Sequence, residues 1–392
     1  MPADLLTAVQ SALAGVLDPE IRRPITELGM VKDVTLSEPG EGADTSGAAG
    51  VDAAILVALT TAGCPLRETI TRDVTAAVAG VPGIAGVEVR LTVMTDAERQ
   101  ELRKQLRGTD AEPVIPFAQP DSLTRVIAVS SGKGGVGKST VTANLAVAMA
   151  RRGLRVGVLD ADIYGFSIPL MLGVTQNPTK VEDMILPPVA HDVKVISIGM
   201  FAPPGQPVVW RGPMLHRALQ QFLADVFWGD LDILLLDLPP GTGDIAISLA
   251  QLLPNAEILV VTTPQQAAAD VAARAGSMAT QTRQRVIGVV ENMSWLTQPD
   301  GSRLEIFGSG GGQEVANTLS ATLGYPVGLL GQVPLDVAVR EGGDVGSPRA
   351  GLDTAASGED LGEGADALVA IADQLAGQRR GLAGRRLGLS VV

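Results

Sequence analysis

The sequence predicts an α/β fold with a mainly parallel sheet and helices on both faces, preceded by a small α+β domain. After residue 122, apolar runs of strand length alternate with helical patterns, and this alternation requires parallel strands joined by crossover helices. Hydrophobic residues make up 46% of the chain but aromatic residues only 3%, so Val, Leu, Ile and Ala must fill the core, as in buried parallel sheets. A length of 392 residues corresponds to two or three domains at roughly 100–200 residues per domain.

The small domain is expected over residues 1–105. Its expected elements are an opening helix, strands at 30–36, 53–59 and 87–94, and a helix after Cys64. Residues 38–50, EPGEGADTSGAAG, have turn composition and no periodicity, which predicts a solvated loop between the first two strands. Residues 106–122 contain three prolines among acidic and polar residues and are expected to form an interdomain linker.

The second domain is expected over residues 123–380, followed by a tail at 381–392. A helix is predicted at 138–152, with Val141, Leu145 and Ala148 on its apolar face and Gly153 ending it. The predicted strands lie within 125–131, 154–162, 232–240, 257–264 and 285–293. Sheets of this kind bind ligands at the carboxyl ends of their strands.

The charge and cysteine content narrow the range of partners. A net charge of −13 and a pI near 4.7 disfavour broad binding to nucleic acid or to an anionic membrane, since such binding depends on Lys and Arg neutralising phosphates. One cysteine, Cys64, excludes an internal disulfide framework, and neither a secretory signal nor a membrane-spanning segment is found. We therefore expect a cytoplasmic protein without a specific nucleic-acid partner.

A glycine-rich segment, GKGGVGKST, follows the predicted strand 125–131 and opens a helix, which is the context that a P-loop requires. Its glycines let successive backbone N–H groups turn toward phosphate oxygens, the helix N-terminus adds positive potential, and Lys138 can reach the outer phosphates. Ser139 is then placed to bind Mg²⁺. The residues expected to contact ATP here are Gly132, Lys133, Gly134, Gly135, Val136, Gly137, Lys138, Ser139 and Thr140.

Three aspartates end apolar strands: Asp160 and Asp162 in LDAD, and Asp237 in LDLPPGTGD. A carboxylate there is costly to desolvate unless a cation or a polarised water compensates it, so all three are site candidates. Any one of them alone could instead cap a helix N-terminus. Gly241 and Gly243 would let the second loop move when a γ-phosphate is lost.

Lys133, directly after the first glycine, makes the motif resemble the deviant P-loop of the MinD, ParA and nitrogenase iron-protein class. In that class this lysine crosses a dimer interface to the partner's nucleotide, so the resemblance implies a homodimeric Mg²⁺-dependent ATPase that converts ATP to ADP and phosphate. The alternative for Lys133 is a solvated loop lysine. By resemblance, the catalytic residues are Lys133, Lys138 and Asp162, with Asp162 orienting the attacking water, and the Mg²⁺ neighbours are Ser139, Asp160 and Asp237.

Asn292, in the motif ENMS at the end of a later strand, corresponds to an asparagine that recognises adenine in the related ATPases. A turn-capping role for Asn292 fits the sequence equally well. Residues 334–336, Pro-Leu-Asp, follow another strand end and are a weaker candidate to close the base pocket.

The chain carries the motifs GKGGVGKST, LDADIYGFSIP, LDLPPGTGD, ENMS and IFGSGGG. Through these motifs it resembles, over nearly its whole length, the Mrp or ApbC family of iron-sulfur cluster carrier ATPases. The motifs DPE, LGMV and TTAGCP of the first domain resemble the small domain of SufT and PaaD assembly proteins. The resemblance implies cluster delivery, with iron-sulfur apoproteins or assembly scaffold proteins as partners.

One departure concerns the cluster itself. The family usually carries a C-x-x-C pair just after ENMS, where this chain has residues 294–300, SWLTQPD. A cluster needs about four thiolates, and a dimer supplies only its two Cys64 sulfurs, so we expect any iron-sulfur cluster to be transient or shared with a partner. Cys64 precedes Pro65 and could be a reactive N-cap thiolate, or equally an inert buried residue.

Two other functions compete with the carrier. A ParA- or MinD-like positioning ATPase shares the ATP chemistry, but such ATPases lack the first domain. The arginine-containing tail RRGLAGRRLGLSVV could contact a membrane surface or be a frayed end. An ATP-coupled electron donor is disfavoured because the cluster cysteines are missing.

Overall fold

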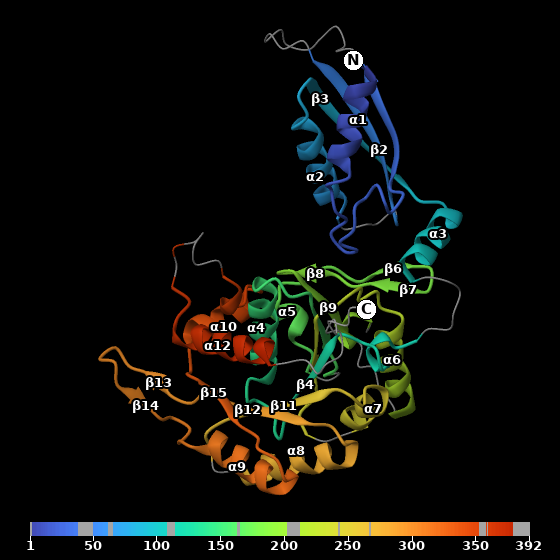
Figure 1. The fold of residues 1–392 in the computed structure, drawn as a ribbon. Helices are drawn as coiled ribbons and strands as arrows, with labels where there is room; N and C mark the ends of the chain where they lie inside the picture. Colours follow the sequence, from blue (N-terminus) through green and yellow to red (C-terminus); the bar gives the residue numbers. More distant parts are fainter. Residues whose placement is uncertain are drawn as a thin grey trace, which may run out of the picture. The chain divides into compact units, whose positions relative to one another are not determined.

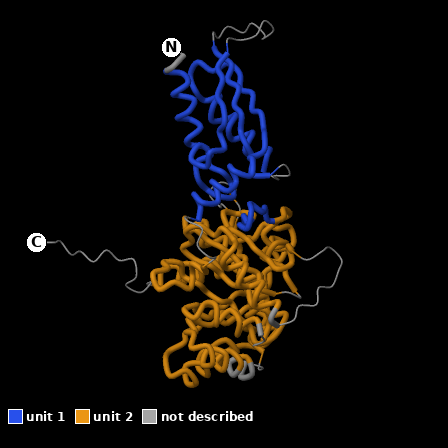
Figure 2. Tube along the Cα trace, turned by 90° about the vertical axis from the view of Figure 1, so that its right-hand side faces the viewer, with its two compact units in different colours: residues 1–113, 178–187 blue, residues 114–177, 188–392 orange. Residues whose placement is uncertain are grey.

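The computed structural model describes residues 2–37, 50–61, 66–107, 114–162, 165–201, 212–241, 244–265, 268–352, 358 and 360–378. The chain forms two compact units, distinguished by colour in Figure 2. The first contains Met1–Pro113 and Pro178–Pro187, and the second contains Val114–Asn177 and Pro188–Val392. The loop at 38–49, Cys64 and the tail 381–392 lie outside the described residues, and the domain boundaries given above stay a prediction.

The first unit holds the predicted opening helix, three strands and following helix. Its elements are α1 (Pro2–Leu13), β1 (Val31–Ser37), β2 (Val51–Leu59), α2 (Arg67–Ala79), β3 (Ile84–Val93), α3 (Asp96–Arg107), and the short hairpin β6 (Thr179–Val181) and β7 (Met184–Leu186). In its sheet, β1 pairs with β2 antiparallel and β2 pairs with β3 parallel. Ala53, Ile55 and Val57 on alternate positions of β2 are fully or almost fully buried, as period-2 patterning of a half-covered sheet requires.

The second unit is built on an eight-stranded sheet. In spatial order its strands are β15 (Leu329–Val333), β12 (Val286–Asn292), β11 (Glu257–Thr262), β4 (Arg125–Ser131), β10 (Ile233–Asp237), β5 (Val156–Asp160), β9 (Val193–Ser197) and β8 (Val189–Ala190). All neighbours pair parallel except β8 and β9, which are antiparallel. The predicted mainly parallel sheet is confirmed, and each predicted strand is present.

Helices cover both faces of this sheet (Figure 1). On one face lie α4 (Lys138–Arg151), α5 (Ile168–Met171), α10 (Val337–Asp344) and α12 (Glu363–Gly377). On the other face lie α6 (Gly212–Ala224), α7 (Asp244–Leu252), α8 (Ala268–Thr282) and α9 (Gly311–Leu323). The remaining short elements are the hairpin β13 (Leu296–Thr297) and β14 (Arg303–Leu304) and the 3-10 turns Pro116–Ala118, Ile198–Phe201 and Arg349–Gly351.

Helix α4 is more deeply buried than its sequence pattern predicts. Val141, Leu145 and Ala148 are buried as expected, but all the other residues from Thr142 through Ala150 are buried as well. The sheet covers one side of α4, and α12 packs along another. The P-loop therefore leads into a central helix that is fixed on several sides, which gives the phosphate-binding loop a rigid base.

Part of the predicted linker is packed rather than solvated. Phe117 is 4% exposed and meets the ring of Trp228 edge-on, with 6.3 Å between the ring centroids. Residues 114–122 of the predicted linker therefore belong to the second unit, which begins at Val114. None of the helices within the described ranges is both long and apolar enough to cross a membrane.

Candidate nucleotide-binding site

The candidate site forms where parallel strands end side by side. Strand β10 pairs with β5 in a register that sets Asp237 directly opposite Asp160, and it also pairs with β4, which leads into the P-loop. Parallel strands present all their carboxyl ends at one edge of the sheet, so residues distant in sequence converge there. Strands β5 and β10 are buried along their whole length, which places both carboxylates in the protein interior.

The P-loop curves between β4 and α4. Gly135 and Gly137 both have φ of +77°, a left-handed conformation that favours glycine, and Gly137 precedes the first residue of α4. A Cβ on Gly132 would lie 2.7 Å from the Cα of Val271 in α8, so the loop can pass that helix only as glycine. The glycines of GKGGVGKST therefore serve two purposes: Gly135 and Gly137 allow a positive φ, and Gly132 allows close contact with α8.

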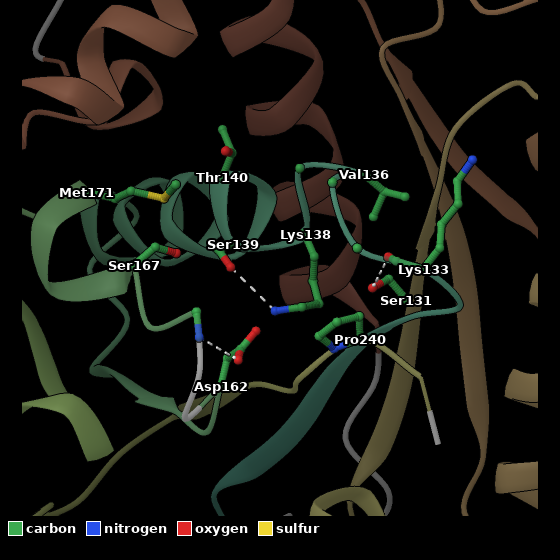
Figure 3. A pocket seen from close by; sticks show the side chains of 14 residues that line it. Ser131, Lys133, Val136, Lys138, Ser139, Thr140, Asp162, Ser167, Met171 and Pro240 are labelled. Carbon is green, nitrogen blue, oxygen red and sulfur yellow. Dashed lines mark hydrogen bonds between the residues drawn. The ribbon is translucent and has the colours of Figure 1, made fainter. Parts of the chain in front are cut away.

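A cavity of about 230 Å³ opens at this loop (Figure 3). It is lined by Ser131, Lys133, Gly134, Gly135, Val136, Gly137, Lys138, Ser139, Thr140, Asp162, Gly165, Ser167, Met171 and Pro240. Eight of the nine predicted P-loop residues, all except Gly132, are in this lining, and Asp162 joins them.

Lys138, Ser139 and Asp237 form one contact network. The Nζ atom of Lys138 lies 2.6 Å from Oδ2 of Asp237, and Ser139 Oγ donates to the same oxygen at 2.6 Å. The Lys138 side chain is only 6% exposed and that of Asp237 only 1%. Thr142 donates to Oδ1 of Asp237 at 2.8 Å, so both carboxylate oxygens have a partner.

The network includes a residue that sequence reasoning missed. Thr142 is fully buried and lies one helical turn after Lys138, and its single hydroxyl hydrogen is shared between Asp237 and the carbonyl oxygen of Lys138, 2.9 Å away. An i, i+4 spacing places two side chains on one helix face, so this spacing was the available signal. Thr142 fixes the orientation of Asp237 from the side opposite Ser139.

Asp160 is completely buried and held by backbone donors. Its Oδ1 accepts from the N–H of Asp162 at 3.1 Å, and its Oδ2 accepts from Ser167 at 3.1 Å and Ile168 at 3.2 Å. Burial, together with the nearby charge of Asp237, raises the pKa of Asp160 to about 7. The carboxyl groups of Asp160 and Asp237 thus share one nearby cation, the Lys138 ammonium group, and a second positive charge would stabilise them further.

Asp162 lies across the cavity from the P-loop, and its side chain and that of Lys138 point into the same space (Figure 3). Its Oδ1 accepts from the N–H of Gly165 at 3.0 Å, which fixes the local turn. On the neighbouring loop after β10, Gly241 has φ of +91° and donates its N–H to Ser131 at 2.9 Å. Gly243, predicted to let this loop move, lies outside the described residues.

Lys133 is among the residues that line the cavity, and its side chain points away from Lys138 (Figure 3). Its ammonium group donates to the side-chain oxygen of Gln265, in the loop after β11. The Lys133 side chain is therefore not fully solvated, and it does not point into the cavity that the Lys138 side chain of the same chain enters.

Asn292 contacts the P-loop. Its Nδ2 donates to the carbonyl of Val136 at 2.9 Å, and the side chain is 8% exposed. Asp336, from the weaker base-pocket candidate, caps α10 by accepting from Ala338 at 2.8 Å, and it also accepts from Gly364 at 3.0 Å. The structure thus gives Asp336 a helix-capping contact.

No group of three or more His, Cys, Asp or Glu side chains suited to a metal occurs within the ranges that the structure describes. Cys64 falls outside those ranges.

Comparison with known proteins assigns the fold and the family. Residues 122–375 match the family model described as NUBPL iron-transfer P-loop NTPase, and residues 6–91 match a model described as iron-sulfur cluster assembly protein. The chain belongs to the iron-transfer P-loop NTPase family.

Relatives of this family member match along nearly its entire length. A protein of Mycobacterium bovis named iron-sulfur cluster carrier protein is 64% identical over 386 residues, covering 98% of this chain and 97% of the relative. A Synechocystis protein of the same name is 41% identical and covers 95% of this chain and 97% of the relative. A solved nucleotide-binding protein from Archaeoglobus fulgidus, in complex with ADP, is 34% identical with a TM-score of 0.49, covering 64% of this chain and 91% of that one.

In this iron-transfer NTPase, the segment after ENMS is a closed hairpin, β13–β14. Its turn is held by the N–H of Gln298, which donates to Ser302 at 2.9 Å, and by Asp300, which accepts from the N–H of Ser302 at 2.9 Å. At the hairpin's base, the Arg303 guanidinium stacks 3.9 Å from the centre of the Trp295 ring. In the Mrp or ApbC family that the sequence resembles, this position usually carries a C-x-x-C pair. In this chain it holds a turn closed by hydrogen bonds among Gln298, Asp300 and Ser302.

Proposed function

We propose that this chain is an Mg²⁺-dependent ATPase that carries iron-sulfur clusters to apoproteins in the cytoplasm. The observation that carries this proposal is the 64% identity to a named iron-sulfur cluster carrier protein across 98% of the chain, through both the small unit and the NTPase unit. The match of residues 6–91 to an iron-sulfur assembly model supports the carrier over a ParA- or MinD-like positioning ATPase, since the latter class lacks this domain.

The side chains around the P-loop fit Mg²⁺ and a nucleotide. Asp160 and Asp237 are fully buried neighbours with Lys138 as their nearby cation, and burial raises the pKa of Asp160 to about 7. A divalent cation supplies the positive charge that this arrangement lacks, and carboxylate and hydroxyl oxygens are the ligands that Mg²⁺ prefers. Ser139, Asp160 and Asp237 would hold the metal directly or through its waters, and the metal would neutralise phosphate charge.

The chain's own groups support phosphoryl transfer to water. The backbone N–H groups of residues 134–139 and the Lys138 ammonium would bind the phosphates, and Asp162 would orient the attacking water from across the cavity. Asn292 would contact the adenine from the end of β12. Lys133, whose side chain leads away from its own Lys138, would reach the nucleotide of a second copy in a homodimer.

Cluster ligation would be shared. The chain has one cysteine, Cys64, so a homodimer offers two thiolates where a cluster needs about four. The proposed cargo state is therefore a labile cluster held with an added thiol, a scaffold protein or the receiving apoprotein.

The test is anaerobic reconstitution of wild type and Cys64→Ser with iron and sulfide, with and without glutathione, followed by desalting and iron quantification. The loaded protein is then mixed with an apo-ferredoxin in the presence of ATP, ADP or neither. We expect a labile cluster that depends on Cys64 and glutathione and is delivered faster with ATP, while Lys138→Ala shows no acceleration by ATP.

Two results would count against the proposal in different ways. A stable, stoichiometric cluster on Cys64→Ser would contradict the shared-ligand count, because its ligands would have to be other residues. Absence of transfer from wild type under every condition, with ATP turnover intact, would contradict the carrier role.

A further inference from the structure

Glu291 is a buried carboxylate to which the proposed function gives no role. It precedes Asn292 at the end of β12 and is fully buried. Its Oε2 accepts from the backbone N–H of Gly312 at 2.6 Å, and its Oε1 accepts from the side-chain amide of Gln332 at 2.6 Å. Burying a carboxylate costs desolvation free energy unless hydrogen bonds compensate it, so the bonds to Gly312 and Gln332 must offset the burial of Glu291.

The Gly312 contact fastens the start of α9 against two strand ends. A Cβ on Gly311 would lie 2.6 Å from the carbonyl oxygen of Pro264, which follows β11. A Cβ on Gly312 would lie 2.6 Å from the Cβ of Glu291 itself. The glycine run in IFGSGGG therefore permits an approach that a larger residue would block, and the positive end of the α9 dipole stabilises the Glu291 charge.

The two strand ends fastened in this way contact the P-loop on either side of Gly134 and Gly135. After β11, Gln265 accepts a hydrogen bond from Lys133, which comes before that pair of glycines. At the end of β12, Asn292 donates to the carbonyl of Val136, which comes after it. Phosphate-binding N–H groups lie between these two contacts, so their directions depend on where the strand ends are held.

We infer that Glu291 is a positioning residue for the adenine-nucleotide site, acting through Asn292 and residues 263–265 to hold the P-loop in its phosphate-binding shape. The inference rests on the proposed function, because it presupposes that the P-loop binds ATP and ADP. Binding groups lose affinity when the residues that support them are removed, since the productive geometry tolerates displacements of only about 0.5 Å.

The experiment compares wild type with Glu291→Ala, Glu291→Gln and Gln332→Ala. The matched control is Glu314→Ala, which removes an exposed carboxylate from the first turn of the same helix, α9. A fluorescent N-methylanthraniloyl-ADP titration measures Kd, hydrogen exchange measures protection of residues 132–137, and thermal unfolding monitors the fold.

We expect Glu291→Ala to bind ADP about ten-fold more weakly, because two hydrogen bonds at a buried site are lost. Its P-loop amides should exchange faster than those of wild type. Glu291→Gln should restore affinity to within about three-fold, since its amide oxygen can accept from Gly312 while the Gln332 amide reverses to face it. Glu314→Ala should match wild type.

Equal affinity of wild type and Glu291→Ala would overturn the inference, as would a Glu291→Gln variant as weak as Glu291→Ala. If Glu291→Ala does not fold, Gln332→Ala decides: its side chain is exposed, a measurable loss of ADP affinity supports the inference, and unchanged affinity refutes it. Failure of wild type to bind ADP or ATP would refute the proposed function instead, and failure of cluster transfer alone would leave the role of Glu291 standing.

Discussion

The ammonium group of Lys138 lies 2.6 Å from the carboxylate of Asp237, and both side chains are almost completely buried. Ser139 donates to the same carboxylate oxygen, so the residues expected to meet phosphate and metal are already bonded to one another. An incoming phosphate must therefore compete with Asp237 for Lys138, and a metal must compete with Lys138 for Asp237. Because Lys138 and Asp237 must give up each other to bind phosphate and metal, a substitution of either residue should change both nucleotide binding and stability.

We expect Lys138→Ala to abolish tight ATP binding because the cation for the outer phosphates is gone. It should also lower the free energy of unfolding by about 3 kcal/mol, since the Asp237 carboxylate stays buried without its partner. Adding Asp237→Asn should recover much of the stability but none of the binding. Nucleotide titration and urea denaturation measure the two effects, and undiminished ATP affinity in Lys138→Ala would remove the P-loop assignment.

The stability of the nucleotide-free protein should fall with rising pH through Asp160. Burial raises the pKa of this carboxyl from 3.8 to about 7, so the folded protein keeps a proton that the unfolded chain has lost. Its stabilising contribution is complete below about pH 4 and disappears as the pH rises through about 7.

The measurement is the thermal midpoint of wild type and Asp160→Asn between about pH 5 and pH 8, the window in which the Asp160 contribution fades. Wild type should lose stability relative to Asp160→Asn over this range. Asp230→Asn is the control, because the Asp230 side chain is 95% exposed. Parallel pH profiles for wild type and Asp160→Asn would contradict the prediction.

Substitution of Asp162 should slow ATP hydrolysis without weakening ATP binding. Asp162→Ala should keep ATP affinity but lower phosphate release by about 10²-fold or more, as expected when a water-orienting carboxylate is lost. Asp162→Asn tests the charge separately, because its amide oxygen can still accept from the N–H of Gly165. Slow turnover in both variants supports the role of the charge, whereas normal turnover in both would exclude Asp162 from the reaction.

Lys133→Ala should retain nucleotide binding but lose ATP-dependent self-association, because its side chain points away from Lys138 of its own chain (Figure 3). Light scattering with and without ATP measures association, with Lys180→Ala as a control for loss of an exposed lysine. Gln265→Ala should leave association intact, since it removes only the partner that holds Lys133 in the single chain. A Lys133→Ala protein that dimerises and turns over normally would show that the lysine is only a loop residue.

Much of the fold could be predicted because strands and helices leave local patterns. The runs RVIAVSS and EILVVT are β4 and β11 as the structure has them, since their continuous apolar residues require burial on both faces. The short strands β6 to β9 were missed, because two to five residues carry too little periodicity to distinguish a strand from a loop. Thr142 was missed for a different reason: its partner, Asp237, belongs to a strand far along the chain.

The sequence by itself determined which residue types end the strands: a glycine-rich loop with Lys138 after β4, and aspartates after β5 and β10. Only the tertiary structure decided that β5 and β10 are neighbours, which brings Asp160 opposite Asp237, and that Asn292 and Gln265 support the P-loop from two other strands. The physical reason is that periodicity and turn chemistry arise between residues close in the chain. Strand order and hydrogen bonds across the sheet depend instead on how all the helices and strands share one core, and that choice minimises the free energy of the whole domain.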